Sequence, residues 1–141
     1  MNVSEILRRK GKDVHKIGPD AYLSDVVQAL VDHNCGSLLV CEGEAIVGII
    51  TERDILRACA ADQDVLTKIP VSQWMTAELV TATPNESISR IMSLMTERRI
   101  RHLPIVEDDQ LCGMISIGDV VKVQTAELAM ENEYLKTYIQ S

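Results

Sequence analysis

The stretch that decides the fold is Gly48-Ile49-Ile50-Thr51-Glu52-Arg53-Asp54, because it recurs as Gly113-Met114-Ile115-Ser116-Ile117-Gly118-Asp119. Each copy starts with glycine, continues through two apolar residues, and places a hydroxyl residue three positions before an aspartate. The two copies are 65 residues apart. A motif that recurs at one offset indicates an internal duplication, which constrains the architecture before any helix or strand is assigned.

The same offset aligns residues 14–57 with residues 79–122 without a gap, and seven of the 44 aligned pairs are identical. The apolar positions coincide as well. In each copy an extended stretch (15–17 or 80–82) ends at a proline, and a helix with a one-sided apolar stripe follows. Two short β-type runs come next, at 37–41 and 45–50 in the first copy and at 103–106 and 111–115 in the second. A second helix closes each copy.

These patterns predict a mixed α/β (α+β) fold made of two β-α-β-β-α repeats packed as a pseudo-two-fold pair. One repeat of about 45 residues is too small to bury a sheet face and two helices alone, so the repeats should pack together. We expect residues 1–70 to form the first repeat with a short N-terminal helix (3–9) and a linker. Residues 71–141 should form the second repeat, whose last helix runs from 119 to about 138.

Charge and composition exclude several classes of protein. The chain has 141 residues with 14 Lys and Arg against 21 Asp and Glu, a net charge of −7 that repels nucleic acids and anionic bilayers. No apolar run approaches the roughly 20 residues of a spanning helix, and the charged first 13 residues do not read as a secretory signal. The four cysteines lack metal-ligand spacing. We therefore predict reduced thiols, a cytoplasmic location, no metal site, and no nucleic-acid or membrane partner.

Two further strings join the duplicated motif, namely Val80-Thr81-Ala82-Thr83-Pro84-Asn85-Glu86 and Arg99-Ile100-Arg101-His102-Leu103-Pro104-Ile105-Val106. Together these segments resemble the tandem cystathionine β-synthase (CBS) domain pair, over about residues 1–125. The resemblance implies two clefts between the repeats, each able to hold an adenosine ligand, and often a homodimer. Members of this family sense AMP, ATP, S-adenosylmethionine or nicotinamide dinucleotides such as NAD, and others bind no known ligand. We rank AMP-like ligands first.

The repeated hydroxyl and aspartate, Thr51 with Asp54 and Ser116 with Asp119, are the first candidate ligand contacts. A carboxylate at the start of a helix can accept hydrogen bonds from both hydroxyls of a ribose, and the helix N-terminus attracts phosphate. The same spacing fits a capping box, in which the two side chains only satisfy backbone donors. Both roles can coexist, and the repetition favours ligand contact.

Cationic residues form the second group of candidates. Arg98, Arg99, Arg101 and His102 cluster just before a strand of the second copy, where a guanidinium could bind phosphate in a bidentate manner. Arg98 and Arg99 could instead be a solvated helix end that complements the helix dipole. The first copy lacks the Arg-His pair and has Arg53 where the second has Gly118, so the two clefts should be unequal.

An adenine base needs an apolar slot with a few backbone polar groups. We expect its walls at Ile17, Ile50, Ile100 and Ile115, with backbone contacts near Gly18 and Thr83. Each of these isoleucines could equally be an ordinary core residue.

No catalytic motif occurs in the sequence, which predicts a non-catalytic regulatory module that changes its dimer or a protein target when an adenosine nucleotide binds. A redox switch at Cys35 is a lesser alternative. A second hypothesis is a ligand-free dimerisation module. It rests on Val121, Leu128 and Leu135, which are seven apart and could dock on a partner chain or on the protein's own core.

Overall fold

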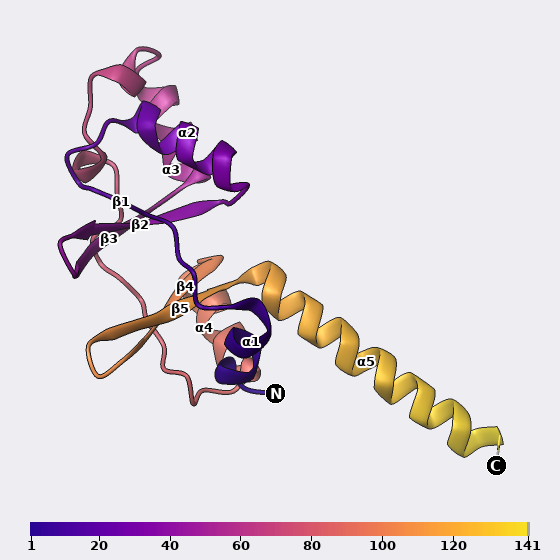
Figure 1. Ribbon diagram of the computed structural model, residues 1–141. Coiled ribbons are helices and arrows are strands. Elements are labelled where there is room, and N and C mark those ends of the chain that lie inside the picture. Colours follow the sequence, from indigo (N-terminus) through magenta and orange to yellow (C-terminus); the bar gives the residue numbers. More distant parts are fainter. Residues whose placement is uncertain (141) are drawn as a thin grey trace. The chain divides into compact units, whose positions relative to one another are not determined.

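The computed structural model describes residues 1–140, which form two compact units (Figure 1). One unit consists of residues 14–79. The other combines residues 1–13 with the chain from residue 80 onward. Each unit has helices and a small sheet of its own, so the predicted mixed α/β class is confirmed.

The unit of residues 14–79 is built on a three-stranded sheet of order β1-β2-β3. Strand β1 is parallel to β2, and β2 is antiparallel to β3. The apolar stripe of α2 and one face of α3 pack on this sheet, because their buried residues share one hydrophobic cluster with Leu38, Val40 and Ile50. The elements are β1 (Lys16–Ile17), α2 (Leu23–His33), β2 (Ser37–Glu42), β3 (Ala45–Thr51), α3 (Glu52–Ala61) and two short 3-10 helices, η1 (Val65–Thr67) and η2 (Val71–Gln73).

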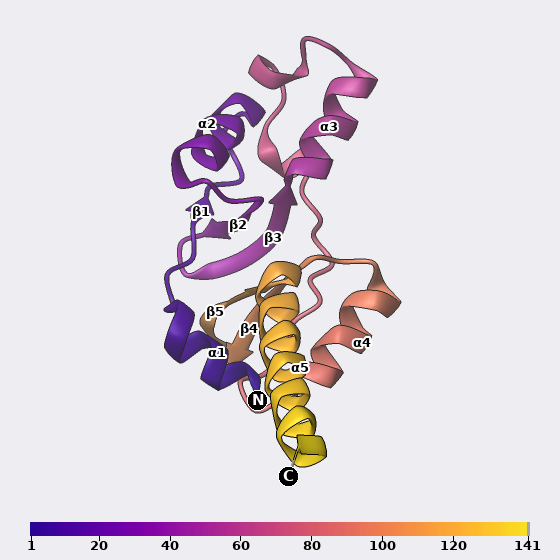
Figure 2. The ribbon, with the colours of Figure 1, turned by 90° about the vertical axis from the view of Figure 1, so that its right-hand side faces the viewer.

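The other unit contains an antiparallel pair, β4 with β5, and Ala82 forms a parallel bridge to Ile105 where β1 stands in the first unit. Its core joins the first helix of the chain to the second repeat, since Val3, Ile6 and Leu7 cluster with Ile91, Leu103 and Ile115. The elements are α1 (Val3–Lys10), α4 (Ile88–Arg98), β4 (His102–Glu107), β5 (Gln110–Ser116) and α5 (Ile117–Gln140). Figure 2 shows α1, α4 and α5 around this strand pair.

The boundaries of the elements repeat at the predicted offset. Helices α2 and α4, strands β2 and β4, and strands β3 and β5 begin and end 65 residues apart. Each hairpin has an irregularity at the same place, between Val40 and Cys41 and between Ile105 and Val106. Even the left-handed residues that end α2 and α4, Asn34 and Arg99, correspond. The internal duplication is therefore visible in the backbone as well as in the sequence.

The motif glycine leaves room for a different segment in each unit. A Cβ atom on Gly48 would lie 2.7 Å from Met75 Sδ and 3.0 Å from the Thr76 carbonyl oxygen. A Cβ atom on Gly113 would lie 2.7 Å from Leu7 Cδ2. The linker therefore passes over the first hairpin, whereas α1 covers the second.

Helix α1 packs on the second repeat, although the sequence placed it with the first. Asn2 caps it by accepting from the Glu5 N–H, and the Val3 and Ser4 N–H groups donate to the carbonyls of Glu86 and Pro84. Its buried face fills the space beside Gly113 that the linker fills beside Gly48. The division of the sequence into repeats at residues 70 and 71 stays a prediction, while packing assigns α1 to the other unit.

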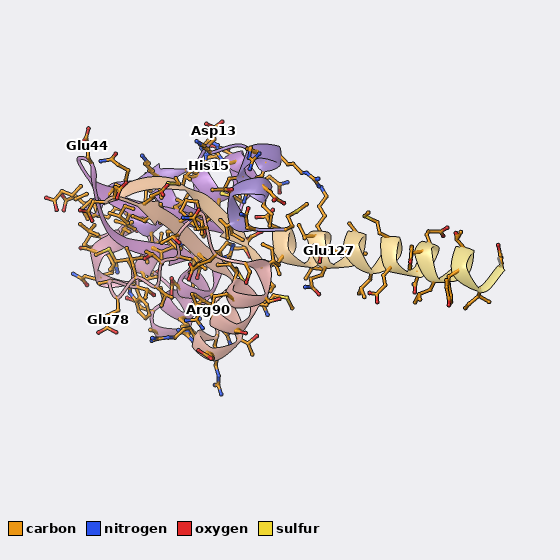
Figure 3. The ribbon with its side chains drawn as sticks, turned by 90° about the horizontal axis from the view of Figure 1, so that it is seen from below. Asp13, His15, Glu44, Glu78, Arg90 and Glu127 are labelled. Carbon is orange, nitrogen blue, oxygen red and sulfur yellow. The ribbon has the colours of Figure 1, made fainter. Side chains whose placement is uncertain are left out.

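Helix α5 starts against α4 and β5 and then extends beyond the rest of its unit (Figures 1 and 3). Of its residues up to Gln140, only Val120 is buried. Leu128 is 58% exposed and Leu135 47% exposed. Their predicted alternative of packing on the protein's own core is therefore wrong. Within residues 1–140, no helix is both long and apolar enough to cross a membrane.

Candidate functional site

The duplicated motif places an aspartate at the junction between a strand and a helix in each unit. In the first unit Thr51 ends β3 and is the N-cap of α3. The Thr51 hydroxyl accepts from the Asp54 N–H at 3.4 Å, while Asp54 Oδ2 accepts from the Thr51 N–H at 2.9 Å and from its hydroxyl at 3.2 Å. This is a complete capping box, and Asp54 as a residue is only 8% exposed.

The second unit repeats this arrangement with one addition. Asp119 Oδ2 accepts from the Ser116 N–H at 2.8 Å and from its hydroxyl at 3.0 Å. The ammonium of Lys10, the last residue of α1, donates to the same oxygen at 2.6 Å and to the Met114 carbonyl at 2.7 Å. Helix α1 is thus tied to the second junction through a lysine that is 109 residues away in the sequence.

The charge of Asp119 is stabilised by these donors. Burial alone would raise the pKa of this carboxyl, but the hydrogen bond and positive charge of Lys10 and the donors of Ser116 hold the pKa below its ordinary value. Asp119 is therefore an anion at neutral pH, half of a partly buried ion pair.

The capping role that the sequence left open is present at both junctions. Capping leaves one oxygen of each carboxylate available, because the hydrogen bonds described for the side chains of Asp54 and Asp119 are all accepted by Oδ2. A carboxylate offers about four acceptor positions on two oxygens. The caps therefore fix the orientation of each aspartate while Oδ1 points elsewhere.

Among the predicted basic residues, His102 lies across the strand pair from a capping residue. It begins β4 directly opposite Ser116, and side chains of opposite residues lie on the same face of a strand pair. Arg101 is exposed, and its carbonyl accepts from the Ile117 N–H at the start of α5. Arg99 takes the left-handed conformation that ends α4, and Arg53 is exposed in the first turn of α3.

Two of the predicted adenine walls are core residues. Ile50 and Ile115 have no exposed surface and belong to the hydrophobic clusters of their own units. Side chains alternate between the two faces of a strand, so each isoleucine points to the face opposite to the Thr51 or Ser116 that ends its strand. This face is the buried one. This burial favours the alternative of ordinary core residues, and their assignment to a ligand slot stays a prediction.

The other predicted contacts keep some access to solvent. Ile17 and Ile100 are partly buried against the edges of the two clusters, and Gly18 is exposed. Thr83 is exposed too, but its backbone N–H donates to Glu86 Oε2 at 2.8 Å. Its carbonyl accepts from the Glu86 N–H at 3.3 Å and has a second acceptor position for contact with a base.

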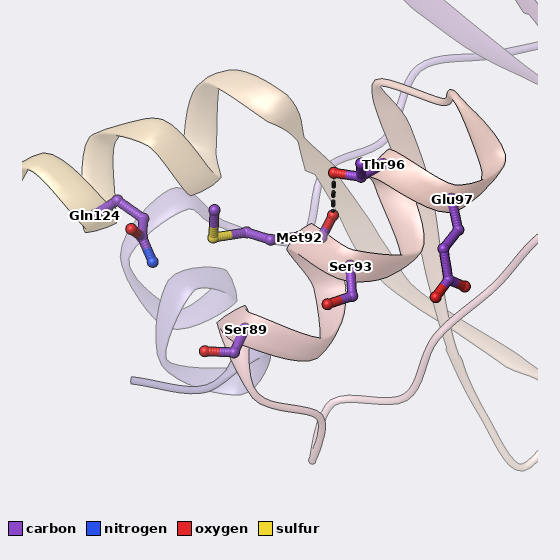
Figure 4. Close-up of a pocket in the computed structure, with 6 residues that line it drawn as sticks. All are labelled: Ser89, Met92, Ser93, Thr96, Glu97 and Gln124. Carbon is purple, nitrogen blue, oxygen red and sulfur yellow. Dashed lines mark hydrogen bonds between the residues drawn. The ribbon is translucent and has the colours of Figure 1, made fainter.

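A groove of about 530 Å³ lies in the second unit between the outer face of α4 and α5 (Figure 4). Its lining includes no basic residue and none of the predicted site residues: Ser89, Met92, Ser93, Thr96, Glu97 and Gln124. An anionic nucleotide would find no positively charged partner in this lining. In addition, within residues 1–140 no cluster of three or more potential ligands could hold a metal ion.

Lys10 is the site residue that the sequence did not indicate. The N-terminal helix reads as amphipathic with a basic last turn, which is the ordinary pattern for a solvated helix end. Only the packing of α1 on Gly113 brings this lysine to Asp119. No spacing rule covers a contact over such a sequence separation.

Two similar units, each with a capped aspartate at the end of a β-hairpin, define a tandem domain pair. The family model for the CBS domain matches residues 3–61 and 71–126, and the chain belongs to this family.

Relatives and solved structures agree with this assignment. The mitochondrial CBS domain-containing protein CBSX3 of Arabidopsis thaliana is 38% identical over 98% of this chain and 71% of its own length. The crystal structure of the CBS-domain protein ATU1752 from Agrobacterium tumefaciens is 37% identical, with a TM-score of 0.86 over 88% of this chain and 99% of that one. A CBS domain pair of protein MJ0100, described in complex with 5′-methylthioadenosine and S-adenosylmethionine, is 25% identical with a TM-score of 0.76, over 87% of this chain and 98% of that one.

Proposed function

We propose that this protein is a non-catalytic regulatory module that binds adenosine nucleotides in the clefts implied by its CBS repeats. The observation that carries the proposal is the pair of matched aspartates, each oriented by a capping box through one oxygen. A ribose diol would be received at the other oxygen of each carboxylate. The N-terminus of α3 or α5 would then contribute its positive dipole end to a phosphate.

Support for the ligand class comes from a relative of similar fold. The MJ0100 domain pair is described with two adenosine derivatives that share a ribose diol. Neither methylthioadenosine nor S-adenosylmethionine carries a phosphate, so the ribose diol is the shared feature that a carboxylate can recognise. We rank AMP first for this chain, with ATP, NAD and S-adenosylmethionine as further candidates, because cationic residues accompany the aspartates.

Roles for the remaining residues follow from their positions. His102, beside Ser116, and Arg53, beside Asp54, would contact phosphate oxygens. Arg101 and Arg99 are exposed near the start of β4 and would add positive potential. Ile17, Gly18, Ile100 and Thr83 would contact the base.

Regulation would arise from differential binding. A ligand that contacts residues of both repeats stabilises one relative placement of them, and a homodimer partner or a protein target responds to that placement. A cytoplasmic location stays part of the proposal. Because CBSX3 is described as mitochondrial, fractionation of cells that express the chain would decide between these compartments.

Thermal unfolding with and without ligand tests the proposal directly. At 100 times its dissociation constant a ligand adds about 2.7 kcal/mol of stability. For a chain of this size each kcal/mol shifts the midpoint by roughly 2–5 °C. We expect a clear shift of the melting temperature with AMP and smaller or absent shifts with ATP, NAD and S-adenosylmethionine. If none of these four ligands shifts the melting temperature, the proposal is wrong.

Asp54→Asn and Asp119→Asn identify the atoms involved. Asparagine keeps one acceptor for the cap and loses the anionic pair of oxygens, so each variant should fold and lose the ligand shift at its own site. Glu52→Gln is the matched control, because it removes an exposed carboxylate from the same helix turn as Asp54. If the aspartate variants keep their full shifts, the carboxylates do not bind the sugar.

A second candidate function is dimerisation without a ligand. It is favoured by α5, whose apolar residues Leu128 and Leu135 are exposed beyond the rest of the unit. In that case the chain would show one oligomeric mass with or without nucleotide. A change of mass or melting temperature with AMP favours the first function.

A further inference from the structure

The two junctions differ in one charged contact. Lys10 donates to Asp119 Oδ2 at 2.6 Å, whereas no lysine or arginine of residues 14–79 forms an ion pair with Asp54. The difference follows from what covers each hairpin. Helix α1, with Lys10 at its end, lies over the second hairpin, and the linker segment at Met75 and Thr76 lies over the first.

This contact changes the charge that a ligand meets. Asp119 and Lys10 together are neutral, and both are only partly exposed, at 22% and 34% of their side-chain surface. Asp54 has no such ion-pair partner among Lys and Arg of residues 14–79, and the residue as a whole is buried. At Asp119 the ammonium of Lys10, bonded to the carboxylate itself, offsets the repulsion of an anionic ligand. At Asp54 the neighbouring cation is Arg53, which is exposed and forms no ion pair with the carboxylate, so it offsets the repulsion less.

The ammonium also has hydrogen-bonding capacity left. It carries three N–H donors, and the Met114 carbonyl and Asp119 Oδ2 account for two of them. The two acceptors fix the position of the nitrogen, because one is on β5 and the other on α5. A phosphate oxygen would receive the third N–H without disturbing either contact.

We propose that Lys10 determines ligand specificity at the Asp119 site, favouring nucleotides that carry a phosphate over the uncharged nucleoside. The Asp54 site lacks this residue and discriminates less against adenosine. This inference rests on the proposed function, because it assigns a charge preference to one of the two proposed sites. It treats α1 as part of a ligand site and not only as a cover for the sheet.

The experiment is calorimetric titration of AMP and of adenosine into the full chain that carries Asp54→Asn, so that only the Asp119 site is measured. In this background Lys10→Met should weaken AMP binding about tenfold, as expected for one charge-assisted contact, and change adenosine binding less than about twofold. Lys10→Arg should keep most of the preference. Lys12→Met is the matched control, because it removes the same charge two residues away from an exposed position.

Each result has a definite meaning. If Lys10→Met lowers the affinities for AMP and adenosine by the same factor, or changes neither affinity, Lys10 sets no preference and the inference is wrong. The proposed nucleotide binding would not be affected by either result. If the Asp54→Asn protein and the unmodified protein bind neither compound, the proposed function fails and this inference with it. If Lys10→Met and Lys10→Gln both fail to fold while Lys12→Met folds, the lysine is structural and the inference is wrong.

Discussion

At the scale of single residues, the ion pair of Lys10 with Asp119 makes stability depend on pH in a defined direction. The pKa of Asp119 in the folded protein lies below its ordinary value of 3.8. Above that value both folded and unfolded states hold the carboxylate ionised, and the stabilisation is complete. As the pH falls, the unfolded chain takes up its proton first, so stability is lost until the folded carboxyl is protonated too.

We therefore expect Lys10→Met to cost on the order of 1 kcal/mol near neutral pH and much less at about pH 3. Urea unfolding of both proteins at the two pH values measures this difference. A cost that is the same at both pH values would show that the lysine stabilises the chain through its apolar stem and not through the charge of Asp119.

The glycine of the motif gives a second prediction at this scale. A Cβ atom on Gly48 meets the Thr76 backbone at 3.0 Å as well as Met75, and the backbone cannot move without breaking the bridge between Ile49 and Thr76. Gly48→Ala should therefore destabilise the protein by about 1–3 kcal/mol. Gly18→Ala is the control, because no atom lies within 4 Å of its added Cβ, and it should change stability by less than about 0.5 kcal/mol. Equal effects in denaturant unfolding would contradict the close approach at Gly48.

At the scale of elements, periodicity predicted the helices and strands well because the two copies constrain each other. An apolar stripe at one place in the first copy supports the same helix in the second, and α2 and α4 do coincide at the expected offset. The extended stretch at 80–82 pairs with β4 through a single parallel bridge. The Ala82 N–H donates to the Pro104 carbonyl at 3.1 Å, and the Ala82 carbonyl accepts from the Val106 N–H at 2.9 Å.

Part of the candidate site could not be predicted from local patterns. The spacing of Thr51 and Asp54 identified the junction, and the cap and the ligand contact share that spacing. Because side chains alternate along a strand, Ile50 lies on the face opposite to Thr51, and this face is the buried one. The contact of Lys10 depends on the packing of α1, which no pattern within either repeat contains.

Helix α5 carries the prediction about assembly. A helix that extends beyond its unit is only marginally stable in water, and its exposed Leu128 and Leu135 lie on one side at a spacing of seven residues. If α5 mediates the proposed homodimer, Leu128→Glu together with Leu135→Glu should convert the dimer to a monomer, because like charges would face each other across the pair.

Light scattering coupled to size exclusion measures the mass. Glu133→Gln is the control on α5, because it alters an exposed charge away from these leucines. A dimer that survives the double substitution would show that α5 is not the contact between copies.

At the scale of the whole molecule, the chain has two hydrophobic cores and two similar junctions, each core contained in one unit. The duplication therefore supplies internally matched substitutions. A change in one unit can be compared with the same change 65 residues away, in the other unit. Comparing such matched substitutions shows whether a change alters the stability of the core, the affinity for the ligand, or both.

Ile50→Val and Ile115→Val use this property, since both residues are fully buried and occupy the same position in the two units. Each should lower the free energy of unfolding by about 0.5–1.5 kcal/mol. The double variant should show the sum within about 0.5 kcal/mol, because the two side chains belong to separate clusters. Because neither residue has surface to offer a ligand, the affinity for AMP should stay the same in all three variants. Denaturant unfolding and calorimetry of the same samples give both quantities, and a loss of affinity in either single variant would return that isoleucine to the ligand site.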